Sequence, residues 1–154
     1  MPICNPTDLK VLLKPGARLL GLDVGTKTIG LALSDTRRVI ASPLDTIRRT
    51  RFRDDAQRIV HEVEKHGVGG LVVGLPLGLD GNPTPRVQGV RQFARNLLAV
   101  VDLPLAFWDE RLSTAAVERG MIEADLSRQR RSAIIDRAAA AYILQGLLDR
   151  IAHS

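Results

Sequence analysis

Residues 19–33, Leu-Leu-Gly-Leu-Asp-Val-Gly-Thr-Lys-Thr-Ile-Gly-Leu-Ala-Leu, contain two apolar runs separated by a short polar turn. Short apolar segments on either side of Gly-Thr-Lys are typical of two β-strands joined as a hairpin. Asp23 lies within the first of these runs. A carboxylate removed from water is costly unless it is paired, hydrogen-bonded or bound to a cation. We therefore expect Asp23 to have a specific partner.

The rest of the chain predicts an α/β fold. The spacing of apolar and turn residues predicts a strand over residues 39–47, a helix over 51–66, a strand over 68–76, a helix over about 84–100, a strand over 103–110, a short helix capped by Ser113 and reaching about residue 123, and a last helix over 132–152. Pro43 favours an edge position for the first of these strands. This order predicts a five-stranded mixed sheet, in which an antiparallel three-strand meander is followed by two parallel strands, with helices on both faces.

The length and composition indicate one domain. The chain has 154 residues, enough for a single hydrophobic core. We expect residues 1–16 to form a flexible tail and residues 17–154 to form the domain. A single cysteine argues against a disulfide framework or a cysteine-based zinc site. No segment approaches the roughly 20 apolar residues of a membrane span, and no signal peptide is apparent, so we expect a cytoplasmic protein without a membrane partner.

The charge balance favours a nucleic-acid partner. The chain has 22 Lys and Arg against 17 Asp and Glu, a net charge of +5. Arginines cluster in residues 48–53 and 128–131. A basic surface attracts phosphates, although many basic domains bind no nucleic acid. Aromatic residues make up only 3% of the chain, which argues against a platform that stacks bases.

Three acidic residues are candidates for one site. Asp109 and Glu110 end a predicted strand, and strand alternation sends their side chains to opposite faces, so at most one can join Asp23. Asp136 shares one face of the last predicted helix with small and apolar residues, namely Ala139, Ala140, Ile143 and Leu147. Carboxylates suit Mg²⁺ or Mn²⁺ better than zinc, and two such ions can cleave a phosphodiester. The alternative is structural: each acid could serve as a turn residue or pair with a nearby arginine.

Four segments together resemble the YqgF family of RNase H-like nucleases, a family of Holliday junction resolvases and pre-ribosomal RNA nucleases. They are Leu-Asp-Val-Gly-Thr-Lys-Thr-Ile-Gly-Leu-Ala at 22–32, Val-Gly-Leu-Pro-Leu-Gly-Leu-Asp-Gly at 73–81, Asp-Glu-Arg-Leu-Ser-Thr at 109–114 and, more weakly, Ile-Asp-Arg-Ala-Ala at 135–139. The resemblance extends from about residue 18 to residue 148. Many relatives carry lysine two residues before the last aspartate, where this chain has Ile134. Arg130, Arg131 or Arg137 could supply that charge instead.

The resemblance implies an RNase H-like fold and a set of site residues. It implies that Asp23, Glu110 and Asp136 are catalytic acids that bind two Mg²⁺ or Mn²⁺ ions, and it selects Glu110 over Asp109. It also implies that Thr26, Lys27 and Arg111 lie beside the substrate. Three further arginines precede the helix that carries Asp136, and we expect them to contact substrate phosphates; they are Arg128, Arg130 and Arg131.

The expected function is metal-dependent hydrolysis of phosphodiesters. By resemblance, the substrate is the 5′ end of pre-16S rRNA, a branched DNA such as a Holliday junction, or both, and a homodimer is one arrangement that the family allows. Two other functions are compatible with the sequence. The first is a nucleic-acid-binding accessory protein that does not cleave. The second is an actin-like nucleotide-binding fragment, because residues 23–26 resemble a phosphate-binding hairpin; the chain is too short for both domains of such enzymes.

Overall fold

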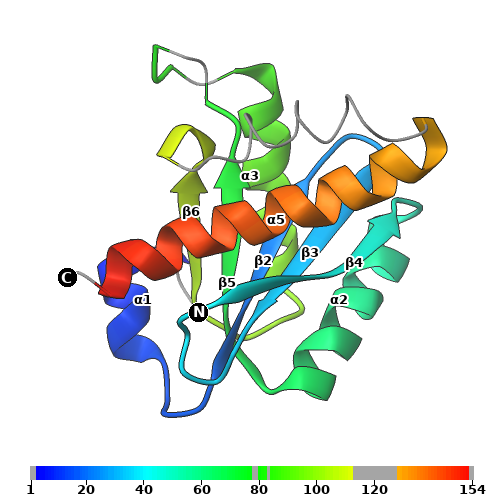
Figure 1. Ribbon diagram of the computed structural model, residues 1–154. Coiled ribbons are helices and arrows are strands. Elements are labelled where there is room, and N and C mark those ends of the chain that lie inside the picture. The colour runs from blue at the N-terminus through cyan, green and yellow to red at the C-terminus, as the bar shows by residue number, and fades with distance from the viewer. Residues whose placement is uncertain (1–2, 78–79, 83, 113–127, 153–154) are drawn as a thin grey trace.

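The computed structural model describes residues 3–77, 80–82, 84–112 and 128–152 (Figure 1). In sequence order the elements are β1 (Ile3–Cys4), α1 (Pro6–Leu12), β2 (Arg18–Val24), β3 (Thr28–Ser34), β4 (Ala41–Arg48), α2 (Phe52–His66), β5 (Val68–Leu75), α3 (Pro85–Leu98), β6 (Leu105–Asp109), the 3₁₀ helix η1 (Glu110–Leu112) and α5 (Arg128–Ala152). The strands form one sheet in the order β1-β6-β5-β2-β3-β4. Within the described ranges, no helix is both long and apolar enough to cross a membrane.

Strands β2, β3 and β4 form the antiparallel meander that the sequence predicts. In the first hairpin, Asp23 pairs with Gly30. The turn is closed by Gly25, whose backbone N–H donates to the Thr28 carbonyl at 2.8 Å. Strand β4 lies at the edge of the sheet, as Pro43 indicates, and its register with β3 shifts beside that proline. Proline has no N–H to donate, so an irregular edge strand tolerates it.

Strands β5 and β6 continue the sheet in parallel. Val73 in β5 lies between Leu22 of β2 and Phe107 of β6. Nearly every residue of β5 is buried. A parallel strand that is covered on both faces has no polar face, which explains the continuous apolar run in the sequence. The predicted buried central strand is therefore confirmed.

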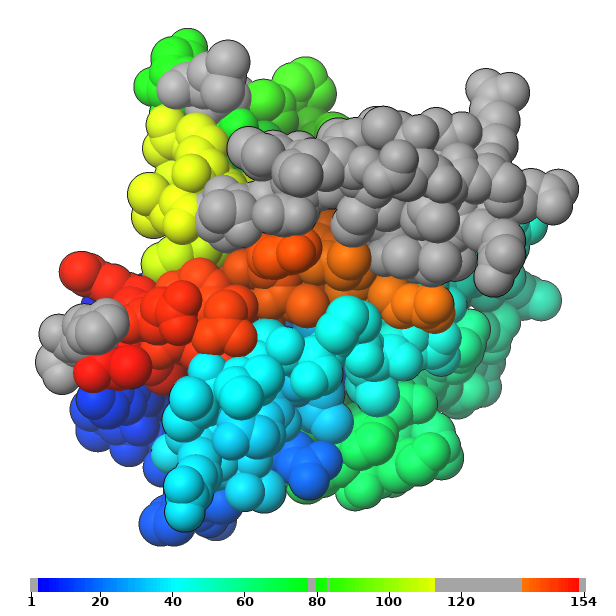
Figure 2. All heavy atoms as spheres, in the orientation of Figure 1, coloured from blue at the N-terminus to red at the C-terminus, as the bar shows by residue number. Residues whose placement is uncertain are grey.

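Helices cover both faces of the sheet. Helix α5 crosses one face, while α2 and α3 lie against the other (Figure 1). In the space-filling view, α5 lies across the front of the molecule with β4 beside it (Figure 2). The approach of α5 is close, because a Cβ on Gly21 would stand only 2.9 Å from the Cβ of Leu144. Alternate residues of the four inner strands, β2, β3, β5 and β6, therefore enter two separate cores.

The structure of the N-terminal residues contradicts two predictions, the flexible tail and the five-stranded sheet. Residues 3–13 are part of the fold rather than a tail: Ile3 pairs with Leu105 of β6, and Leu9 in α1 is fully buried. Helix α1 begins where Asn5 Oδ1 accepts from the Asp8 N–H at 2.8 Å, with Pro6 in its first turn. Asparagine followed by proline favours the start of a helix. The prediction of a tail took the prolines of this segment only as breaks in structure. Strand β1 also brings the sheet to six strands instead of five.

The start of the last helix is a third correction. The sequence predicts that the last helix begins at residue 132, but α5 already begins at Arg128. Arginine and glutamine have high helix propensity, so the basic cluster extends the helix instead of preceding it. The backbones of Arg128, Arg130 and Arg131 are therefore helical. The short helix predicted to begin at Ser113 falls outside the described residues.

Candidate active site

Asp23 is an enclosed carboxylate near the end of β2. Its residue exposure is 5%. Gly21, two residues earlier on the same strand, faces Leu144 of α5. Because residues two apart in a strand share a face, Asp23 leaves the sheet on the α5 side. Its partner across the hairpin is Gly30, which has no side chain to crowd the carboxylate.

Glu110 approaches the same face from β6. It is the first residue of η1, directly after the strand. Its Oε1 lies 3.0 Å from where a Cβ on Gly74 would stand, and the Ile143 side chain of α5 borders the same position. Gly74 follows Val73, which pairs with Leu22, the residue before Asp23. Glu110 therefore lies over the strand next to Asp23, in space that Gly74 leaves open.

Asp109 has a different environment from its neighbour. Its Oδ2 accepts from Arg111 Nη2 at 2.6 Å, and both carboxylate oxygens accept from Arg111 Nε at 3.0 Å. The hydrogen bond from Arg111 lowers the pKa of the Asp109 carboxyl. Asp109 is thus engaged by an arginine, whereas Glu110 lies over Gly74.

Arg111 also contacts the loop after β5. Its Nη1 lies 3.2 Å from where a Cβ on Gly81 would stand, at a residue with a φ of 84° that favours glycine. Asp80 accepts hydrogen bonds from Asn82, which lower the pKa of its carboxyl, and the charge of Arg111 lowers it further. The guanidinium therefore connects the end of β6 to this loop. Its predicted contact with substrate stays a prediction.

Asp136 lies in α5, the helix that covers the Asp23 face. It precedes Ala140 by one helical turn, and the Ala140 carbonyl oxygen is 3.2 Å from where a Cβ on Gly21 would stand. The side chains of residues 128–136 lie outside the described part of the structure, so the predicted roles of Asp136 and of the arginines at 128, 130 and 131 stay predictions. Among the residues that the structure does describe, no three His, Cys, Asp or Glu side chains gather as a metal site.

The β2–β3 turn places the predicted substrate neighbours Thr26 and Lys27 at the Asp23 end of β2. Both are exposed. Arg49 fixes this turn: its Nη1 donates to the Gly25 carbonyl at 2.7 Å, and its backbone N–H donates to the Lys27 carbonyl at 2.9 Å. Arg86 of α3 also reaches this region, through a 3.3 Å hydrogen bond to the Val24 carbonyl. Nothing in the sequence beyond its charge marks Arg86.

A model of the RuvX family, described as Holliday junction resolvase, matches residues 17–150. The chain belongs to the RuvX family. The resemblance to RNase H-like resolvases and pre-ribosomal RNA nucleases is thereby confirmed. Relatives of this RuvX chain include a protein from Paramagnetospirillum magneticum, 60% identical, with 97% of this chain and 96% of the relative covered. A second, from Rhodospirillum rubrum, is 53% identical over 98% of this chain and 94% of the relative. Both are named "Putative pre-16S rRNA nuclease".

Solved structures show which fold the RuvX chain shares. RuvC from T. thermophilus, in complex with a Holliday junction substrate, aligns with a TM-score of 0.56 at 12% identity, covering 88% of this chain and 96% of RuvC. The yeast mitochondrial Holliday junction resolvase Ydc2 aligns with a TM-score of 0.53 at 13% identity, covering 94% of this chain and 84% of Ydc2. At such identities the likeness establishes the resolvase-type RNase H-like fold.

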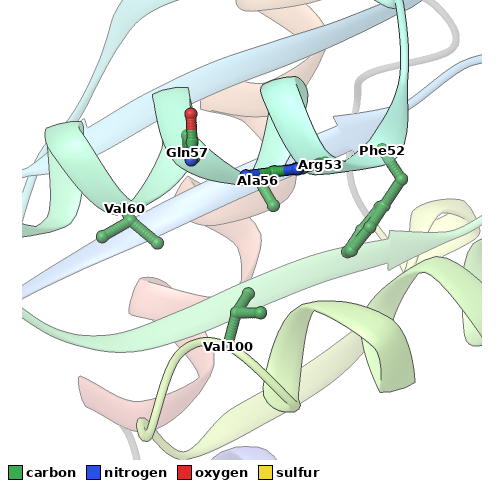
Figure 3. A pocket seen from close by; sticks show the side chains of 6 residues that line it. All are labelled: Phe52, Arg53, Ala56, Gln57, Val60 and Val100. Carbon is green, nitrogen blue, oxygen red and sulfur yellow. The ribbon is translucent and has the colours of Figure 1, made fainter.

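A separate hollow of this RuvX chain lies on the other side of the sheet. It has a volume of about 370 Å³ and is bordered by α2 and by Val100. Figure 3 shows Phe52, Val60 and Val100 around it. Its lining is mainly apolar and contains no acidic side chain. Hard metal ions need oxygen ligands, so the acids on the α5 face remain the candidate catalytic centre.

Proposed function

We propose that this chain is a nuclease that hydrolyses phosphodiester bonds in nucleic acid with the help of divalent metal ions. The observation that carries the proposal is the enclosed Asp23 on the same face as Glu110, next to the glycine over which Glu110 lies. Membership of a resolvase family supports the reaction class. The relatives named for pre-16S rRNA support processing of that precursor, and we propose its 5′ end as the part that is processed. The family description supports resolution of Holliday junctions.

The donor set suits Mg²⁺ or Mn²⁺. Asp23 and Glu110 offer carboxylate oxygens, the ligands that hard divalent cations prefer. Gly74 supports this fit, because a Cβ there would stand 3.0 Å from Glu110 Oε1 and displace the side chain. We assign the third carboxylate to Asp136 and propose that the three acids hold two ions. Bound ions of this kind would activate water and stabilise the leaving oxygen.

The remaining site residues would position the substrate. Thr26 and Lys27 are exposed at the turn that follows Asp23 and can contact a phosphate there. Arg111 would border the strand from the β6 side, and the arginines at 128, 130 and 131 would approach it from the start of α5. Phosphate contacts fix the register of a strand without reading its bases. These residues would therefore serve RNA and branched DNA alike.

Two further parts of the proposal concern the location and the assembly of the protein. We infer a cytoplasmic location from the proposed role in ribosomal RNA processing. A homodimer is proposed because a four-way junction offers two equivalent strands to two active sites. Sedimentation with and without a junction tests this assembly, and a monomer under both conditions would contradict it.

The decisive experiment offers two substrates side by side. Wild type and Asp23→Asn are incubated with 5′-extended 16S rRNA precursor and with a four-way DNA junction, each with Mg²⁺, with Mn²⁺ and with EDTA. We expect metal-dependent cleavage by wild type and none by the variant. Binding of both substrates without cleavage under any condition would favour the accessory protein. An ATP titration run alongside would favour the actin-like alternative if it showed specific binding.

A further inference from the structure

A second hollow adjoins the candidate active site but opens on the opposite face of the sheet. It has a volume of about 360 Å³. The Gly25–Thr26 turn forms one wall, Arg49 after β4 a second, and Pro85 and Arg86 at the start of α3 a third. Val24 also lines it, one residue after Asp23. Neighbouring residues in a strand point to opposite faces, so the hollow and the Asp23 carboxylate share one strand end without sharing a face.

Arg49 is held in place before any ligand arrives. Its Nη1 donates to the Gly25 carbonyl at 2.7 Å, and its guanidinium carbon lies 5.3 Å from the centre of the Phe93 ring. The following residue, Thr50, donates through both its N–H and its hydroxyl to the buried carboxylate of Asp55, each at 3.1 Å from Oδ1. A half-buried arginine fixed in this way loses little side-chain entropy on binding an anion.

Arg86 brings a second guanidinium to the same hollow. Its Nη2 donates to the Val24 carbonyl at 3.3 Å, so the two arginines bond consecutive carbonyls of the chain. In the described part of the chain, neither arginine forms an ion pair with a carboxylate. Each guanidinium has five N–H donors, and a neutral carbonyl does not cancel its charge. The hollow therefore combines two positive charges with donors that remain available.

We propose that this Arg49–Arg86 pocket binds a backbone phosphate of the nucleic-acid strand whose scissile bond lies at the carboxylates. The inference rests on the proposed nuclease function. Planar guanidinium groups match phosphate oxygens in pairs, which suits them to this ligand. A strand that crosses the exposed Thr26 and Lys27 passes from the Asp23 face to this pocket. A polymer can occupy both sites at once, and the pocket thereby holds the strand beyond the point of cleavage.

The test measures binding without cleavage. Fluorescence anisotropy with labelled single-stranded RNA is recorded in EDTA over a range of KCl concentrations for wild type, Arg86→Gln and Arg95→Gln. Arg95 is the matched control because it lies on α3 nine residues later, on the opposite side of the helix, and contacts Gln92 at 3.0 Å. Both variants remove one charge from an exposed helical position.

Arg86→Gln should bind RNA about tenfold more weakly than wild type, as expected for one charge-assisted contact. Its slope of log affinity against log salt should fall by about one phosphate contact. Arg95→Gln should keep the wild-type slope. Equal slopes in the two variants would overturn the proposal that this pocket binds a phosphate. Arg49→Lys, which keeps the charge but loses the planar fork, should also bind more weakly while melting within a few degrees of wild type.

Cleavage by the same proteins separates this inference from the proposed function. If the wild-type protein cleaves, and Arg86→Gln and Arg95→Gln have equal slopes of log affinity against log salt, the phosphate pocket is contradicted and the nuclease function is supported. If only Arg86→Gln loses affinity for RNA, and the wild-type protein cleaves neither substrate, the phosphate pocket is supported and the nuclease function is contradicted. Side-chain NMR gives a direct readout: the Nε–H signals of Arg49 and Arg86 should shift on addition of the RNA, and unshifted signals contradict the assignment.

Discussion

At the scale of single residues, Asp23 combines charge with near-complete enclosure, at 5% exposure. Asp23→Asn keeps the shape of the side chain and removes its charge. We predict that cleavage is abolished and that the melting temperature in EDTA is unchanged or higher, because without metal the loss of one negative charge relieves its repulsion with the nearby Glu110. Cleavage rates and thermal melting of the purified variant check both parts. Turnover close to that of wild type would contradict the assignment of Asp23 to the metals.

Substitutions of the adjacent acids Asp109 and Glu110 should have very different effects on cleavage. Glu110→Gln should lose cleavage, whereas Asp109→Asn should retain most of it, because Asp109 is engaged by Arg111. The loss of this partly exposed pair should cost at most about 1 kcal/mol in the free energy of unfolding. Single-turnover rates and chemical denaturation measure the two effects. Equal losses of cleavage at both positions would show that the face assignment is wrong.

Gly74 gives a test that leaves every acid in place. In Gly74→Ala the new methyl would stand 3.0 Å from Glu110 Oε1 and 2.6 Å from Ile143 Cδ1. We predict a loss of cleavage and a destabilisation of about 1–3 kcal/mol, typical of overpacking. Gly21→Ala is the control, since its methyl would press on Leu144 without touching Glu110. If both variants lose the same stability and the same activity, the function of Glu110 does not depend on the space that Gly74 leaves open.

At the scale of elements, one carboxylate accepts two backbone hydrogen bonds within the β3–β4 connection. Asp35 Oδ1 accepts from the N–H groups of Val39 at 2.7 Å and Ile40 at 3.0 Å, and these hydrogen bonds lower the pKa of Asp35. A lowered folded-state pKa contributes stability above the unfolded pKa and loses it as the pH falls through the folded value. Asp35→Ala should therefore melt lower than wild type at pH 7, and the difference should shrink in acid. Melting curves across pH would contradict this if the difference were constant.

The same scale shows what local sequence could predict. The hairpin of residues 19–33 was predictable because its apolar runs and turn are contiguous, and strand alternation separated Asp109 from Glu110. Strand β1 was not predictable, because two residues become a strand only by pairing with Leu105 and Ala106, about a hundred positions later. The convergence of Arg49 and Arg86 on one turn likewise depends on packing between α3 and the sheet. The start of α5 at Arg128 was missed, because the charge of residues 128–131 obscured their helix propensity.

At the scale of the whole molecule, the N-terminal segment closes the core under α5. Leu9 is fully buried, whereas Leu12, in the same helix, is 45% exposed. Leu9→Ala should cost about 2–5 kcal/mol in the free energy of unfolding, as deletion of a buried leucine side chain usually does. Leu12→Ala should cost less than 1 kcal/mol. Urea denaturation compares them, and equal small losses would restore the interpretation of residues 1–16 as a tail.

Helix α5 also has a consequence for synthesis on the ribosome. A nascent chain that has emerged as far as β6 has all six strands but lacks the helix that covers one face of its sheet. Leu19, Val72 and Trp108 on that face then stay open to water and to chaperones. Asp23 and Glu110 can already be near each other, yet the segment that carries Asp136 has not been made. The proposed catalytic centre therefore becomes complete only after the α5 segment emerges, and we expect a partly synthesised chain that lacks this segment to be inactive.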